Sequence, residues 1–279
     1  MRTRTRRCWL YGATLLSGLA AATVWLPRRM LYPAPAPRPV LPPPGASLLE
    51  LPREDGGRVV ALWLAPAEPH APVLLWFHGN GEQLADQRWW VEQLGRRGLG
   101  VLAVEYPGYG PAAHERPSEE RIYETAEAAL RALGERLEVE AQRTVLGGRS
   151  LGTGVAVELA SRHPAAAVVL ISPYTSIPDV ARHVFRLPLP YRWLVPDHFD
   201  SARKAAALSV PVLVFYGERD ELIPPAMSRR LAAQLPNARV SAIPNAGHGD
   251  ILAVGGAELI DELARFANDS VATAAGRTP

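Results

Sequence analysis

The sequence is poor in cysteine and in net charge, and both shortages exclude classes of protein. Its single cysteine, Cys8, lies ahead of the globular part, so the folded domain can hold no disulfide framework and no thiolate metal site. A formal net charge of +2 at pH 7 argues against a dedicated nucleic-acid binder. Internal repeats are also lacking, which excludes a repeat architecture.

The remaining composition supports a sizeable core. Hydrophobic residues make up 48% and charged residues 21% of the 279 residues, as is typical of globular proteins. That length allows one large domain or two small ones.

An uncharged, mostly apolar run covers residues 8–26. As a helix it would span roughly 28 Å at about 1.5 Å per residue, close to the hydrocarbon thickness of a bilayer. We therefore predict an uncleaved signal-anchor at residues 1–27. More arginines precede the run than directly follow it, which favours a cytoplasmic N-terminus and a folded domain outside the cytoplasm, as in the periplasm. These arginines are Arg2, Arg4, Arg6 and Arg7 before the run and Arg28 and Arg29 after it.

A cleaved signal peptide is the alternative for the same segment, and cleavage would make the protein secreted. The alanines at 20–22 offer small residues for a cleavage site. However, they lie inside the apolar run, which is longer than the usual h-region of roughly 7–15 residues.

Composition divides the rest of the chain into three parts. Residues 28–45 are rich in proline and predict a linker, either a stalk or a lead-in that lies along the edge of the domain. Residues 46–267 form the predicted folded domain. Residues 268–279 are small and polar, which predicts a disordered tail.

Within the predicted domain, apolar strands alternate with amphipathic helices, which is typical of an α/β fold with a mostly parallel central sheet flanked by helices. The predicted strands cover residues 58–65, 72–77, 99–106, 143–146, 165–172, 210–216 and 239–243. The predicted helices cover residues 82–97, 118–136, 151–162, 225–235 and 251–266.

Residues 173–207 interrupt this alternation with prolines and bulky side chains. The segment is short for a full lid domain, so we predict a small cap. Phe185, Leu187, Tyr191 and Trp193 are its candidate lining residues, with plain core packing as the alternative.

Residues 148–152, Gly-Arg-Ser-Leu-Gly, match the pattern G-x-S-x-G. In this pattern a serine sits on a sharp turn between a strand and a helix, where the strained backbone and the close approach of strand and helix require glycine neighbours. Ser150 is therefore a candidate nucleophile. Taken alone, it fits the N-cap of the following helix equally well.

Three other predicted strands are followed directly by residues that fit the same site. They are Asp220, His248 and the loop at 78–81, His-Gly-Asn-Gly. In an open parallel sheet the loops after the strands gather at one edge, so these residues are expected near the candidate nucleophile. Glu218 and Glu221 are alternatives to Asp220 as the acid.

Two other kinds of site are weakly supported. Residues 147–153 match a phosphate-binding loop in their glycines, but Thr153 stands where that loop requires lysine. Asp197, His198 and Asp200 are metal-ligand types without a supporting geometry. We therefore expect no metal and no other cofactor.

Several segments together resemble one known family. They are residues 29–33, 78–80, 105–110, 148–152 and 172–176, with Asp220 and Gly247-His248. In these segments, and in the chain order Ser, Asp, His, the sequence resembles the α/β-hydrolase superfamily over about residues 45–267. It most resembles the membrane-anchored serine hydrolases of the Ser-Asp-His type.

The resemblance implies a role for each site residue. Ser150 would be the nucleophile, His248 the base that takes and returns its proton, and Asp220 the group that orients the imidazole. The backbone N–H groups of Asn80 and Leu151 would form an oxyanion hole.

We therefore predict a serine hydrolase that cleaves ester or thioester bonds through an acyl-enzyme on Ser150. The expected partners are a small-molecule acyl substrate, lipid-like if the cap residues line the site, and a membrane reached through the N-terminal helix. A peptidase or lipase variant of the same chemistry is one alternative. A non-catalytic, membrane-tethered binding protein with the same fold is the other.

Overall fold

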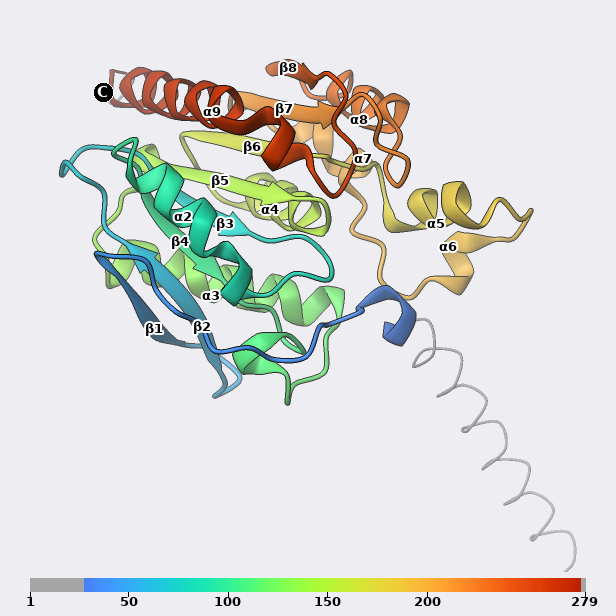
Figure 1. Ribbon diagram of the computed structural model, residues 1–279, viewed down its shortest axis with the longest axis horizontal. Coiled ribbons are helices and arrows are strands. Elements are labelled where there is room, and N and C mark those ends of the chain that lie inside the picture. Colours follow the sequence, from blue (N-terminus) through green and yellow to red (C-terminus); the bar gives the residue numbers. More distant parts are fainter. Residues whose placement is uncertain (1–27, 277–279) are drawn as a thin grey trace, which may run out of the picture.

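The computed structural model of the protein describes residues 28–276 (Figure 1). The predicted signal-anchor at residues 1–27 lies outside the described residues. Within residues 28–276, no helix is both long enough and apolar enough to span a bilayer.

One eight-stranded sheet organises the molecule, in the order β1-β2-β4-β3-β5-β6-β7-β8. The strands from β3 to β8 run parallel, whereas β1 and β2 form an antiparallel hairpin that adds to β4 at one edge. The predicted mostly parallel sheet is confirmed. The strands are β1 (Ala46–Pro52), β2 (Arg58–Leu64), β3 (Val73–Phe77), β4 (Gly100–Val104), β5 (Thr144–Arg149), β6 (Ala167–Ile171), β7 (Val212–Gly217) and β8 (Ala238–Ile243).

Helices cover both faces of the sheet (Figure 1). On one face lie α2 (Arg88–Gly95) and α9 (Ile251–Ala275), and on the other α3 (Glu119–Glu135), α4 (Leu151–Arg162) and α8 (Pro225–Ala232). Every side chain of β3, β4 and β6 is buried, because strands covered on both faces have no side that meets water. The short helices α5 (Ile177–Phe185), α6 (Tyr191–Leu194) and α7 (Ser201–Lys204) fill the interruption between β6 and β7.

Two features of the fold differ from the prediction. The edge strand β1 was missed, because most of its side chains are at least partly exposed and the strand is defined by pairing along its whole length with β2. The predicted disordered tail is wrong for residues 268–275, which continue α9. Ala267 and Val271 are buried there, one helical turn apart, and extend the apolar stripe of that helix.

The proline-rich lead-in lies along the domain and is not a free stalk. Residues 28–31 form a helical turn, and the chain then runs along the domain without regular secondary structure as far as residue 43. The side chain of Gln83 anchors it, accepting from the backbone N–H of Arg38 at 3.0 Å and donating to the carbonyl of Ala36 at 3.1 Å. Tyr32 is buried in the main core.

Candidate active site

Ser150 lies on a strained turn between β5 and α4. Its backbone has φ of 49° and ψ of −116°, a region that side chains other than glycine rarely adopt. A Cβ on Gly148 would lie 2.1 Å from the carbonyl oxygen of Gly152, and one on Gly152 would lie 2.0 Å from that of Phe77. The glycines are therefore required by close backbone contact. The Ser150 hydroxyl does not cap α4, so the N-cap alternative does not describe it.

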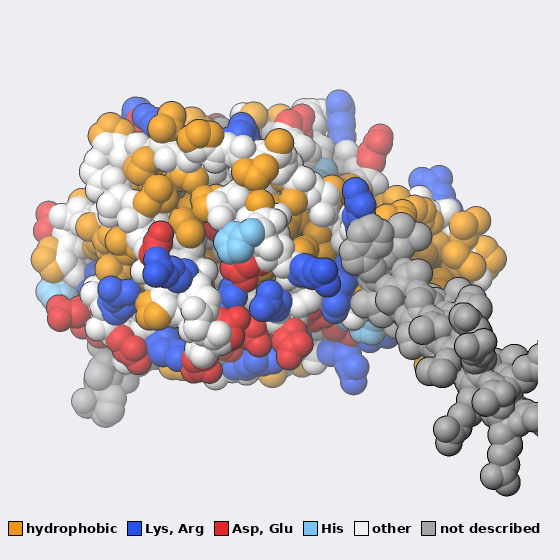
Figure 2. Space-filling view, turned by 90° about the horizontal axis from the view of Figure 1, so that it is seen from below, with side chains coloured by type: hydrophobic (Ala, Val, Ile, Leu, Met, Phe, Trp, Pro, Cys, Tyr) orange, Lys and Arg blue, Asp and Glu red, His pale blue; other side chains and the backbone are white. Residues whose placement is uncertain are grey.

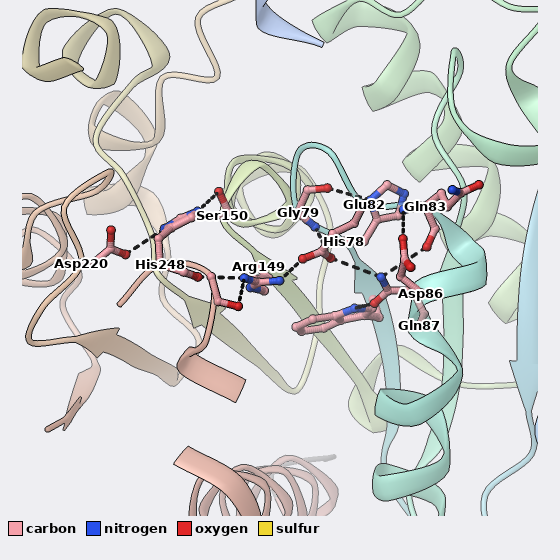
Figure 3. Close-up of polar contacts among 12 residues, drawn as sticks. His78, Gly79, Glu82, Gln83, Asp86, Gln87, Arg149, Ser150, Asp220 and His248 are labelled. Atoms are coloured by element: carbon pink, nitrogen blue, oxygen red, sulfur yellow. Dashed lines mark hydrogen bonds and ion pairs between the residues drawn. The ribbon is translucent and has the colours of Figure 1, made fainter. Parts of the chain in front are cut away.

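Ser150, His248 and Asp220 form a hydrogen-bonded chain (Figure 3). His248 Nε2 lies 3.0 Å from Ser150 Oγ, and His248 Nδ1 lies 2.8 Å from Asp220 Oδ2. The other carboxylate oxygen of Asp220 accepts from the backbone N–H groups of Leu222 at 3.0 Å and Ile223 at 2.8 Å. These bonds orient the carboxylate toward the imidazole.

The geometry also determines where the imidazole proton lies. An ionised carboxylate can only accept a hydrogen bond, so His248 Nδ1 must carry a proton toward Asp220. In the neutral ring Nε2 is then an acceptor, aimed at the Ser150 hydroxyl. This tautomer is the one that can remove the serine proton. Within residues 28–276, the alternative acids Glu218 and Glu221 make no hydrogen bond or ion pair with the ring.

Asn80 and Leu151 line the same cavity as Ser150. No acceptor in the described part of the chain takes a hydrogen bond from either backbone N–H. The side chain of Asn80 does not face the cavity as a donor: its amide donates to the carbonyl of Leu31 at 2.5 Å and accepts from the Tyr109 hydroxyl at 2.6 Å. These two bonds hold the loop that carries the Asn80 N–H.

Arg149 ties two of the site's loops together, a role that the sequence analysis did not predict. Its guanidinium donates to the carbonyl of His248 at 2.8 Å and pairs with Glu82 (Figure 3). The second oxygen of Glu82 accepts from the backbone N–H of Gly79 at 3.0 Å. Burial lowers the pKa of the Arg149 guanidinium, opposed by the charge of Asp220. The only sequence signal was that Arg149 precedes Ser150 in the motif.

His78 shapes its loop and makes no hydrogen bond with Ser150. Its ring is fully buried, with Nδ1 2.9 Å from the carbonyl of Gly79 and Nε2 2.9 Å from the carboxylate of Glu105. The Tyr106 hydroxyl donates to the carbonyl of His78 at 2.9 Å.

A cavity of about 510 Å³ opens above Ser150, and its walls are almost entirely apolar. Of the predicted cap residues, Phe185, Leu187 and Tyr191 line it. Trp193 does not, because it points outward and is 90% exposed. The other lining residues are Met30, Leu31, Asn80, Leu151, Tyr174, Ile177, Val180, Ala181, Val184, Leu189, Leu194, Val195, Leu222 and Ile223. The lead-in thus supplies part of the wall, which sequence reasoning missed.

Asp197 and Asp200, which are of metal-ligand type, are paired with arginines. Asp197 accepts two hydrogen bonds of 2.9 Å from Arg28 and one of 3.1 Å from the Tyr32 hydroxyl. Asp200 accepts from Arg192 at 2.6 Å. Within residues 28–276, no cluster of potential ligands suits a metal ion.

Comparison with known proteins identifies the family. A model of the α/β hydrolase fold matches residues 72–207 and 193–252, so the chain belongs to the α/β-hydrolase family. An uncharacterized protein of Mycobacterium tuberculosis is 34% identical over 279 residues, covering 95% of this chain and 97% of that protein.

Solved structures share the fold at low sequence identity. An esterase of Pyrococcus furiosus superposes with a TM-score of 0.70 at 17% identity, covering 85% of this chain and 97% of that one. A puromycin-hydrolyzing peptidase of M. tuberculosis gives a TM-score of 0.63 at 20% identity, covering 81% of this chain and 40% of that one. At these identities the likeness establishes the fold and leaves the substrate to be argued from the site.

Proposed function

We propose that the protein is a serine hydrolase that cleaves esters or thioesters of apolar acyl groups. The observation that carries the proposal is the chain of hydrogen bonds from Ser150 through His248 to Asp220, with Ser150 lining an apolar cavity.

Acylation follows from this arrangement. His248 Nε2 takes the hydroxyl proton as Ser150 Oγ attacks the carbonyl carbon, and Asp220 stabilises the imidazolium that forms. The N–H groups of Asn80 and Leu151 donate to the oxyanion of the tetrahedral intermediate, and one such donor is typically worth about 2.7–4 kcal/mol. Collapse of the intermediate breaks the bond to the leaving group, which receives the proton from His248 and leaves an acyl-Ser150 ester.

Deacylation repeats these steps with water as the nucleophile. His248 takes a proton from water, hydroxide adds to the acyl carbonyl, and the bond to Ser150 Oγ breaks as the proton returns to the serine. The products are a carboxylic acid and the free enzyme.

The walls of the cavity argue for an apolar acyl group. Its volume of about 510 Å³ lies within the range of roughly 300–1,000 Å³ that is usual for small-molecule sites. Apart from the groups at the floor, its polar atoms are few, so a charged or strongly polar substrate would lose hydration without finding partners.

The test is hydrolysis of a nitrophenyl ester series by the purified full-length chain. We expect turnover of short esters, a rise in kcat/KM as the acyl chain lengthens, and loss of activity in Ser150→Ala. Ser161→Ala is the matched control, because Ser161 lies on α4 and donates only to the carbonyl of Glu158. Equal turnover by wild type and Ser150→Ala would refute the proposal.

A fluorophosphonate probe separates the enzyme from a non-catalytic binding protein, since only an activated Ser150 would be labelled. A peptidase variant of the same chemistry is distinguished by aminoacyl amide substrates. If kcat/KM is higher for the amides than for the matching esters, the protein is a peptidase and not an esterase.

We also propose that residues 1–27 anchor the chain in a membrane, with the catalytic domain outside the cytoplasm. The support is the uncharged run at 8–26 and its flanking arginines. The anchor predicts that the chain stays in the membrane pellet at alkaline pH and keeps its original N-terminus. Release into the supernatant with a new N-terminus near residues 20–27 would show that the segment is a cleaved signal peptide.

A further inference from the structure

Exposed apolar side chains gather around the mouth of the cavity. Figure 2 shows hydrophobic side chains concentrated on the projecting end of the molecule that carries α5 and α6. We call this set the cap rim; its members are Met30, Val184, Phe185, Leu187, Leu189, Trp193, Leu194 and Leu222, all exposed. All except Trp193 also line the cavity, so the cavity opens through an apolar surface.

The cap rim carries the other features of a surface that meets lipid headgroups. Residues 177–195 contain three arginines, of which Arg182 pairs with Asp179 and Arg192 with Asp200. Arg186 makes no ion pair within residues 28–276 and lies between two rim residues, where it can reach lipid phosphates. The 90% exposed Trp193 is the side chain type that favours the boundary between water and bilayer.

The place where the predicted anchor meets the domain limits how far this surface can lie from a membrane. Met30 follows the end of the apolar run at Leu26 by four residues, which span at most roughly 14 Å at about 3.5 Å each. The headgroup layer alone is roughly 5–8 Å thick.

The lead-in is also fastened to the same end of the molecule. Arg28 pairs with Asp197 through two hydrogen bonds of 2.9 Å. In Figure 1 the helical turn at residues 28–31 lies beside α6. The point where the proposed anchor would join the domain, at Arg28, therefore lies next to the cap rim.

We propose that the cap rim docks into the headgroup–acyl boundary of a phospholipid bilayer, with Trp193 and Arg186 at the headgroup level. The mouth of the cavity then faces the lipid, and an acyl chain enters from the bilayer without crossing water. The docking rests on the proposed anchor and not on the proposed serine chemistry, so the two can fail separately.

The test is a depth measurement on the full-length chain. In a Cys8→Ser background, Trp193→Cys is labelled with a nitroxide and reconstituted in phosphatidylcholine–phosphatidylglycerol vesicles. We expect the label to be accessible to oxygen and shielded from a water-soluble nickel chelate. Trp89→Cys is the matched control, because Trp89 is 45% exposed on α2, away from the cap rim, and its label should stay in water.

Each other outcome overturns the docking. Equal chelate accessibility at both positions, with the protein still in the membrane pellet, would place the rim in water beside an intact anchor. Protein absent from the pellet would remove anchor and docking together. If the nitroxide spectrum broadens through label–label interaction as protein density rises, the rim contacts a second copy of the chain and not the lipid.

Activity provides an independent readout. Trp193→Ser should lower hydrolysis of a vesicle-embedded ester several-fold and leave hydrolysis of a water-soluble short ester unchanged. If wild type hydrolyses neither ester, the serine chemistry fails while the depth measurement still decides the docking.

Discussion

Arg149 shows how one side chain can position two halves of a site. It holds the main chain of His248 on one side and Glu82, with the loop of Gly79, on the other. The proposed base, His248, belongs to one of these loops and Asn80, a proposed oxyanion donor, to the other, so the guanidinium bridges the two.

Arg149→Met is therefore expected to lower kcat by roughly 10–100-fold with little change in KM, because a shift of about 1 Å in a catalytic group costs on that order. Steady-state kinetics on a soluble ester would measure it, with the melting temperature taken to separate misplacement from unfolding. Glu82→Gln should give a smaller loss of the same kind. A fully active, stably folded Arg149→Met variant would show that the two loops keep their positions without this side chain.

Gly152 tests the close contact that forms the turn. A Cβ there would lie 2.0 Å from the carbonyl oxygen of Phe77, so Gly152→Ala must push β3 and α4 apart. We expect a loss of about 1–3 kcal/mol in the free energy of unfolding, measured by urea denaturation. Gly134→Ala is the control, because the nearest atom to its Cβ is 3.9 Å away and the position is helical. Equal stabilities for the two variants would contradict the steric argument.

At the scale of elements, the turn between β1 and β2 is held by charge. Arg53 donates to Asp55 at 2.7 Å and to Glu115 at 2.6 Å, which connects the edge hairpin to the loop before α3. The hydrogen bond from Arg53, with help from the Gly57 N–H, lowers the pKa of Asp55 from 3.8 to about 2.

This shift has a defined sign in the pH dependence of stability. The carboxylate binds protons less readily in the folded state, so its contribution is fully present above about pH 4 and is lost as the pH falls toward 2. Asp55→Asn should therefore lose less stability than wild type between pH 5 and pH 2, as followed by thermal unfolding. Parallel pH profiles for the two proteins would show that the Arg53 contact does not persist in solution.

At the scale of the whole molecule, the folded unit begins at the lead-in and not at the first strand. Tyr32 is buried in the main core, and Met30 and Leu31 close one side of the cavity. The carbonyl of Leu31 also receives the side chain of Asn80.

Removal of residues 1–27 should accordingly leave the melting temperature and the turnover of soluble esters unchanged. Removal of residues 1–33 should lower the melting temperature by roughly 5–10 °C, because burial of Tyr32 and the partly exposed Arg28–Asp197 pair are together worth about 2–3 kcal/mol. The longer deletion should also raise KM for long-chain esters. Identical melting temperatures for the two truncations would mean that the lead-in contributes nothing to the fold.

The sequence by itself determined the parallel sheet and the side chains that meet at its edge. Strand periodicity is local, and in a parallel sheet the loops after every strand gather at one edge, so Ser150, Asp220 and His248 converge once the strands are recognised. The requirement for glycines around Ser150 could also be predicted, because it arises from residues that are close in the sequence.

Only the tertiary structure decided which distant side chains hold that edge together and what covers it. The Arg149–Glu82 pair, the contact of Asn80 with Leu31 and the outward orientation of Trp193 join or separate residues far apart in the chain. The strand β1 and the end of α9 likewise form because of what they pack against. No periodicity records such contacts, because their free energy arises only when the assembled sheet brings the partners together.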